Sequence, residues 1–184
     1  MKYLPIIFAA LLSLQGCAAT HELSKEYEPL VAISERPWYA SWLGGSSLGL
    51  ITTVGDTAYV KDLEEWLKRK PVGSPLFKST MHHERTHSRR QLNAGLAGWL
   101  KNYLTDSKFQ WKEEQVGWFV QIRLRMMYGV QFIPAVYADI LSNYTPKMVS
   151  YDDALQWVRD VMSGRWQPAK GDLPADLEEL LNVR

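Results

Sequence analysis

The sequence is poor in cysteine and has no excess of charge of either sign. Cys17 is the only cysteine in 184 residues, so no disulfide within the chain competes for it. Lysine and arginine number 21 against 20 aspartates and glutamates, with no basic block and no acidic tail. Because nucleic-acid binding depends on clustered positive charge, we do not expect DNA or RNA as a partner. Repeats, low-complexity segments and an internal linker are also lacking, which favours one folded domain.

An apolar run over residues 4–14 is too short to span a bilayer comfortably. It follows Lys2 and is itself followed by small residues, an order that is typical of a secretory signal peptide. The segment Leu14-Gln15-Gly16-Cys17 resembles the lipobox of bacterial lipoproteins. We therefore expect a lipoprotein signal peptide over residues 1–16 and exclude these residues from the fold.

The resemblance to lipoproteins implies how the mature chain is attached to a membrane. Cys17 would carry palmitate and further acyl chains, and more than one chain anchors a protein stably. Ala18 stands where an aspartate would retain a lipoprotein at the inner membrane, so the resemblance implies the periplasmic side of the outer membrane. Residues 17–36 are then expected to be the lipid anchor and a polar tether with a little helix. The alternative is an ordinary signal peptide followed by an incidental cysteine.

Residues 37–184 have the pattern of a single domain that is α+β and mainly α-helical. Two β-rich runs, at 50–54 and 57–60, flank Gly55-Asp56 and predict a hairpin. Helical spacing and capping residues predict helices at 62–70, at about 80–104 after a cap at Ser79 or Thr80, at 111–129, at 133–144, at 151–163 after Ser150, and at the C-terminus, with a loop at 71–77. Eight tryptophans are available for a core.

Within the expected 80–104 helix, His83-Glu84-Arg85-Thr86-His87 forms an H-E-x-x-H motif. Histidines four residues apart project from one face of a helix, where two imidazoles can bind one zinc ion. The glutamate after the first histidine then lies beside the zinc-bound water and can accept its proton. The motif predicts His83 and His87 as zinc ligands and Glu84 as the catalytic base. The alternative is an accidental match, because so short a pattern also arises by chance.

A catalytic zinc ion takes a third protein ligand and keeps one position open. The extended motif H-E-x-x-H-x-x-G-x-x-H needs glycine and histidine where this chain has Arg90 and Asn93, and Asp106 has the character of a turn residue. Glu113 and Glu114 remain, near the start of an otherwise apolar helix. A metal ion would compensate the cost of burying a carboxylate there.

Small residues that permit two helices to approach closely favour Glu114 over Glu113. Gly117 lies three residues after Glu114, whereas a valine has that spacing from Glu113. On the motif helix, Ala94 and Gly98 continue the stripe of the two histidines and are also expected to permit close approach. Two alternatives stay open: Glu113 is the ligand, or both glutamates merely solvate the first helical turn and favour its dipole.

An H-E-x-x-H helix followed by a glutamate-bearing helix resembles the small gluzincin metallopeptidases. Their second element, E-x-x-A-Y-x-x-Q, corresponds here to Glu114-Gln115-Val116-Gly117-Trp118-Phe119-Val120-Gln121, with glycine for alanine and tryptophan for tyrosine. The hairpin sequence TTVGDTAYV is similar to the edge-strand region of those domains. Gln91 resembles a glutamine that follows their motif, although it stands one position late. The resemblance covers about residues 48–128.

The resemblance implies a small zincin-like domain whose short sheet packs on the H-E-x-x-H helix. It also implies Zn²⁺ bound by His83, His87 and Glu114, with Glu84 as proton acceptor in peptide-bond hydrolysis. An extended peptide or envelope-protein substrate would pair with the edge of the hairpin. The donor that stabilises the oxyanion stays open among Tyr128, Tyr137, Tyr144 and His82. The competing function is a non-catalytic envelope lipoprotein of the same fold that binds a partner or assists assembly.

The other prominent side chains have simpler expected roles. Arg85, Arg89 and Arg90 are expected on a solvated face, beside an exposed His82. Tryptophans on the helices are expected to fill the core, in particular Trp99, Trp111 and Trp118. The sequence favours no oligomeric state.

Overall fold

The computed structural model of the chain describes residues 32–35, 51–144 and 148–182. The strands are β1 (Ala32–Glu35), β2 (Thr52–Val54) and β3 (Thr57–Val60). The helices are α2 (Leu63–Arg69), α3 (Pro75–Ala94), α4 (Leu96–Thr105), α5 (Ser107–Met127), α6 (Pro134–Ser142), α7 (Tyr151–Ser163) and α8 (Ala175–Leu180). These elements confirm the α+β, mainly α-helical class. The expected signal peptide and Cys17 lie outside the described residues.

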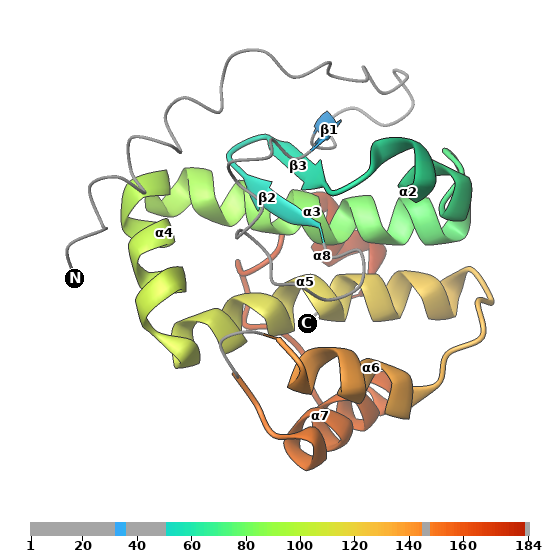
Figure 1. Cartoon of the computed structure of the whole chain (residues 1–184). Coiled ribbons are helices and arrows are strands. Elements are labelled where there is room, and N and C mark those ends of the chain that lie inside the picture. Colours follow the sequence, from blue (N-terminus) through green and yellow to red (C-terminus); the bar gives the residue numbers. More distant parts are fainter. Residues whose placement is uncertain (1–31, 36–50, 145–147, 183–184) are drawn as a thin grey trace.

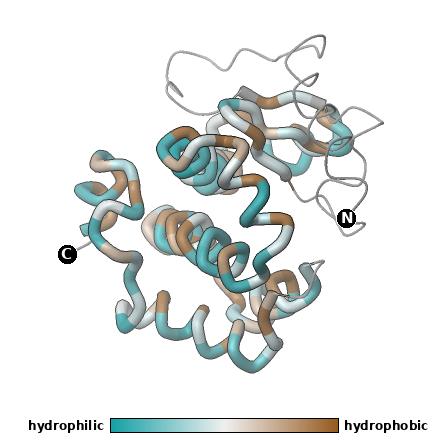
Figure 2. Tube along the Cα trace, turned by 90° about the vertical axis from the view of Figure 1, so that its left-hand side faces the viewer, coloured by the Kyte–Doolittle hydropathy of each residue, from teal (hydrophilic) through white to brown (hydrophobic). Residues whose placement is uncertain are grey.

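The elements are arranged in layers around α3 and α5 (Figure 1). The sheet lies on one side of α3, and α5 lies along the other side. Helices α6 and α7 lie beyond α5, and α4 joins α3 to α5 at one end of the layers. Figure 2 shows the same layers after a turn of 90°, with hydrophilic and hydrophobic residues interspersed along the helices. In the part of the chain that the structure describes, no helix combines the length and apolarity needed to cross a membrane.

The described strands form a three-stranded sheet in the order β1-β3-β2. Strands β2 and β3 are antiparallel and Gly55 in the connecting turn has a φ of 62°, so the predicted hairpin is confirmed. Strand β1 pairs with β3 in parallel, with Ala32 opposite Thr57. Residues 32–35 were expected to belong to the tether, and that expectation is wrong. The reason is apolar burial, because Ile33 packs in the core cluster that lies between the sheet and helices α2 and α3.

Helix α3 begins earlier than predicted, at Pro75, and the expected loop over residues 71–77 is therefore too long. Ser74 is the N-cap, and its hydroxyl accepts a backbone hydrogen bond from the first turn. Proline at the first helical position suits this start, because its missing N–H would have no partner there. Ser79 and Thr80, the expected caps, lie inside the helix and are buried.

The predicted single helix over residues 80–104 is two helices. Gly95 has a φ of 80°, which ends α3 after Ala94 and places α4 in a new direction. Gly98 therefore lies in α4 and not on α3, and both Ala94, the last residue of α3, and Gly98 are exposed. The expectation that they permit close approach of the ligand helix is wrong.

Helix α5 starts at Ser107, because the Asp106 carboxylate accepts hydrogen bonds from the first free backbone N–H groups. Glu113 and Glu114 therefore lie in its second turn, and both are buried. The interpretation that they solvate the first turn is wrong. The predicted cap at Ser150 and the helix after it are confirmed.

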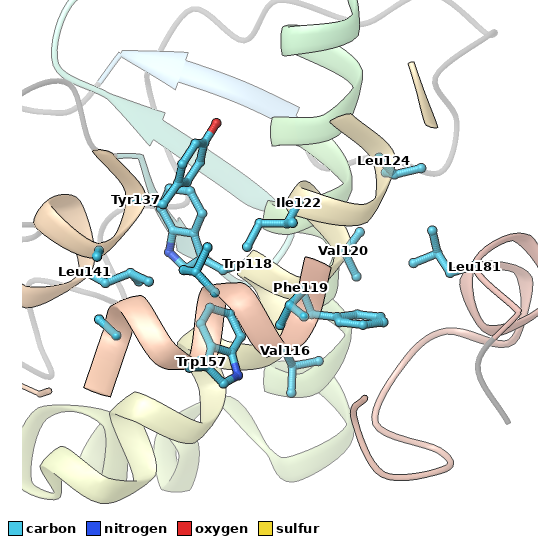
Figure 3. Close-up of a cluster of buried hydrophobic side chains, with 14 of the residues drawn as sticks. Val116, Trp118, Phe119, Val120, Ile122, Leu124, Tyr137, Leu141, Trp157 and Leu181 are labelled. Atoms are coloured by element: carbon cyan, nitrogen blue, oxygen red, sulfur yellow. The ribbon is translucent and has the colours of Figure 1, made fainter. Parts of the chain in front are cut away.

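The main apolar cluster lies on the side of α5 that faces α6 and α7. Figure 3 shows Trp118, Phe119 and Ile122 of α5 together with Tyr137, Leu141 and Trp157 of α6 and α7. Leu181, after α8, completes the cluster beside Phe119 and Val120. Burial of this apolar surface fixes α5 in place, so its opposite side is held against α3.

Candidate metal centre

Three predicted ligands converge between α3 and α5. The Nε2 atoms of His83 and His87 lie 2.9 Å apart. The Glu114 carboxylate lies 3.8 Å from His83 Nε2 through Oε2 and 3.7 Å from His87 Nε2 through Oε1. One ligand atom from each residue lies within 4.8 Å of the others, and all three side chains are buried. This group can hold a metal ion.

The distances between the three side chains and an unsatisfied carboxylate oxygen among them both fit a bound cation. For a tetrahedral ion with bonds of about 2.0–2.1 Å, neighbouring ligand atoms lie about 3.3 Å apart, close to the separations between these three residues. Among the described residues, Glu114 Oε2 is buried without a hydrogen-bond partner. Buried carboxylate oxygens are normally satisfied, and a cation held between the three side chains would satisfy this one.

Gln121 prepares His83 for metal binding. Its Oε1 lies 2.8 Å from His83 Nδ1, so Nδ1 carries the proton and donates it to this hydrogen bond. The lone pair of the ring is then on Nε2, the atom that faces His87 and Glu114. Burial, followed by the nearby His87 ring, lowers the pKa of His83 well below its usual value. The ring is therefore neutral, which is the form that binds a metal.

Gly117 permits the two helices to approach at this point. A Cβ atom at position 117 would lie 2.7 Å from Cδ2 and Nε2 of His83 and 3.0 Å from Nε2 of His87. Those separations are shorter than van der Waals contact, so even alanine does not fit without displacing a ligand. The close-packing reason for favouring Glu114 is confirmed at Gly117.

Glu113 has a different environment from its neighbour Glu114. Arg90 binds the Glu113 carboxylate through Nη2 at 2.7 Å and Nε at 2.8 Å, and Trp99 Nε1 donates to it at 3.0 Å. Burial alone would raise the pKa of Glu113, but hydrogen bonds and charge from Arg90 and the bond from Trp99 lower it. Arg90 also binds Asp172 at 2.8 Å. Glu113 is thus an ion-pair partner that fixes α5 against α3 and the C-terminal segment.

Two tyrosines flank the Glu114 carboxylate. Tyr103 donates a hydrogen bond of 2.5 Å to Oε1 of Glu114. Burial raises the pKa of Tyr144 well above its usual value, and the charge of Glu114 adds to the rise. Tyr144 also accepts a hydrogen bond from Trp118 Nε1 at 3.3 Å. Tyr144 is therefore the one oxyanion candidate from the sequence that the structure brings to Glu114.

The other oxyanion candidates lie elsewhere among the described residues. Tyr137 accepts a hydrogen bond from Arg125 and stacks on Phe132, and Tyr128 is exposed at the end of α5. The expectation that His82 is exposed is wrong, because the residue is half-buried. Burial, together with the charge of Arg85, lowers the pKa of His82 to about 4.

The edge strand β2 contacts the predicted catalytic base directly. Thr53 Oγ1 donates a hydrogen bond of 2.7 Å to Oε2 of Glu84. Burial raises the pKa of Glu84, while His87 and the bond from Thr53 partly oppose the rise. Gln91 ties the same hairpin to α3, because its side chain donates to Thr53 O and accepts from Gly55 N, each at 2.8 Å.

The arginines of α3 correct another expectation. Arg89 is exposed as expected, but Arg85 is buried and binds Asp176 at 2.6 Å, and Arg90 is held by Glu113. Both pairs form because the C-terminal segment and α5 cover this face of α3, which the periodicity of α3 alone does not reveal. Trp99 and Trp118 are buried and Trp111 packs against the main cluster, so their assignment to the core is confirmed.

Thr53 and Tyr103 are contacts of the site that were not among the candidate residues from the sequence. Thr53 lies in a short strand of β-branched residues, and Tyr103 lies in a helical stripe of apolar residues. Neither pattern distinguishes a polar contact from an ordinary packing position. Gln121, by contrast, carries a usable signal, because it stands seven residues, or about two helical turns, after Glu114.

Comparison of the chain with protein-family models, with curated proteins and with solved structures finds no match. The inference of function therefore rests on the residues and on the geometry of the site.

Proposed function

We propose that the protein is a zinc-dependent peptidase whose ion is held by His83, His87 and Glu114. The convergence of these three buried side chains at ligand distances is the observation that carries the proposal. Two imidazoles and one carboxylate form a donor set that suits zinc, and catalytic zinc sites use three protein ligands with one position open. The local resemblance to gluzincin metallopeptidases supports the same assignment.

A bound zinc ion supplies Lewis acidity, which acidifies a water molecule and polarises a substrate carbonyl. The chain itself positions the ligands. Gln121 fixes the orientation and the tautomer of His83, and Tyr103 restrains one oxygen of Glu114. Gly117 leaves the space in which both imidazoles approach α5.

Glu84 is proposed to accept the proton of the attacking water and to pass it to the leaving amine. Its carboxylate is buried on the histidine helix, and one oxygen is held by Thr53 of the edge strand. Burial raises the pKa of Glu84, which makes the carboxylate a stronger base than an exposed one. Tyr144, beside Glu114, is the proposed donor to the oxyanion.

We also propose that Cys17 anchors the protein as a lipoprotein on the periplasmic side of the outer membrane. The lipobox-like sequence supports this proposal. Replacing Cys17 with serine should release the chain from the membrane fraction, as measured by immunoblotting of separated fractions. Retention of the serine variant in that fraction would refute lipid anchoring through Cys17.

The substitution Glu84→Gln tests catalysis separately from metal binding. Glutamine preserves the shape of the side chain but accepts no proton, so we expect the variant to keep its zinc and to lose about 10²–10⁴-fold in peptide turnover. Zinc is measured by elemental analysis and turnover with a panel of fluorogenic peptides. Glu64→Gln, on the exposed surface of α2, is the matched control.

Full activity of Glu84→Gln would refute the assigned base. A wild-type protein that binds zinc and cleaves no peptide would instead favour the non-catalytic lipoprotein.

A further inference from the structure

Two positively charged side chains contact the first half of α3, one helical turn before the residues of the zinc site. Lys70, which caps α2, donates from Nζ to Thr80 Oγ1 at 3.2 Å. Arg125 of α5 donates from Nε to Ser79 Oγ at 3.2 Å. Ser79 and Thr80 each precede a residue of the His83-Glu84 pair by four positions, which corresponds to about one turn, or about 5.4 Å, along the helix.

Neither of these two side chains forms an ion pair with a carboxylate in the described part of the chain. The other buried or half-buried arginines of this region, Arg85 and Arg90, each bind a carboxylate at 2.6–2.8 Å. Lys70 and Arg125 are half-buried and make no ion pair with any described residue. Their polar contacts are hydroxyl groups, which do not carry a compensating charge.

The pKa of Lys70 shows that its charged form is disfavoured at this position. Burial, and then the charge of Arg125, lower the pKa of Lys70 to about 8. Glu84 is the carboxylate whose charge opposes this change. Lys70 and Arg125 therefore lie in the electrostatic environment of the zinc site. An anion bound beside them would relieve the repulsion between them.

Aromatic rings hold both cations in place without neutralising them. Lys70 Nζ lies 5.1 Å from the centre of the Trp66 ring, and the Arg125 guanidinium carbon lies 5.4 Å from the centre of the Tyr137 ring. A pair of pre-positioned donors of this kind binds carboxylates well, because little conformational freedom is lost on binding.

We propose that Lys70 and Arg125 form a subsite for a substrate carboxylate located one or two residues from the scissile bond. The proposal rests on the peptidase function proposed above. An extended peptide advances about 3.3–3.6 Å per residue, so one helical turn from His83-Glu84 corresponds to one or two residues of substrate. The carboxylate comes either from a free peptide C-terminus or from an aspartate or glutamate side chain.

Peptide binding to the zinc-loaded Glu84→Gln protein tests this subsite without turnover. Calorimetry compares tetra-alanine that has a free C-terminus with the same peptide as its C-terminal amide. A second series keeps the amide and places glutamate or glutamine at each position in turn. In one of the two series, we expect the peptide with the carboxylate to bind at least about tenfold more tightly than its neutral counterpart. The reason is that charge-assisted hydrogen bonds are stronger than neutral ones.

Lys70→Gln and Arg125→Gln, each added to Glu84→Gln, assign the preference to the cations. Each of these two substitutions should abolish most of the preference for a carboxylate. The control is Lys68→Gln, at an exposed lysine of α2, which should preserve the preference. If the preference for a carboxylate persists in both variants, the carboxylate binds the metal ion and the proposal is overturned. Equal binding of the acidic and neutral peptides, or no binding of any peptide, also overturns it, and neither result depends on the folding of the lysine and arginine variants. Failure of the peptidase function itself is recognised separately, from zinc content and turnover of the wild-type protein.

Discussion

The side of helix α5 that faces α3 and the side that faces α6 and α7 are both buried, yet they differ in chemistry. Towards α3 the helix presents Glu114 and Gln121, which meet two histidines across Gly117. Towards α6 and α7 it presents aromatic and aliphatic side chains such as Phe119 and Ile122. The same helix thus carries a polar interface and an apolar one.

This difference separates the sources of stability and function. Apolar burial is a non-directional contribution to stability, whereas a buried carboxylate beside imidazoles costs free energy unless an ion or a proton compensates it. The α6–α7 side is therefore expected to determine the free energy of unfolding. The α3 side is expected to determine metal affinity.

Phe119→Ala should have the largest effect on stability. Phe119 is fully buried in the apolar cluster, so its truncation should lower the free energy of unfolding by about 3–5 kcal/mol. Urea denaturation measures this change. The zinc content of the folded fraction should stay the same, and a selective loss of zinc from folded protein would contradict the separation of the two sides.

Gly117→Ala should have a smaller effect on stability and a specific effect on the metal. The added methyl group overlaps the His83 ring, which should cost about 1–3 kcal/mol of unfolding free energy and displace a ligand. The matched control is Gly98→Ala in α4, where nothing lies within 4 Å of the new methyl group. Replacing a helical glycine there should stabilise the protein by about 0.5–1 kcal/mol.

Competition with a fluorescent zinc chelator measures the affinity of both glycine variants. We expect weaker zinc binding in Gly117→Ala alone. Equal zinc affinity of the two variants would show that the approach of α3 to α5 is not needed for the site.

The part of the site that could be predicted from the sequence is the part that local geometry determines. Helical periodicity alone places His83 and His87 on one face, and the small residue at Gly117 indicated which glutamate faces them. The hairpin was also predictable, because Gly55 supplies the backbone conformation of its turn.

The remainder depends on contacts between segments that are distant in sequence. The bond from Thr53 to Glu84 spans 31 residues, and the pair formed by Arg85 and Asp176 spans 91. No local pattern encodes such pairs. The break at Gly95 could not be predicted from spacing either, because the apolar spacing continues across it into α4.

The zinc content of two neighbouring variants tests the central claim most directly. Glu113 and Glu114 are chemically identical, adjacent and both buried, but one binds Arg90 and the other faces the histidines. Elemental analysis should find one zinc ion per chain in the wild-type protein and in Glu113→Gln, and a loss of zinc in Glu114→Gln. A metal-free wild-type protein, or equal zinc content in the two variants, would contradict the assignment of His83, His87 and Glu114 as the metal centre.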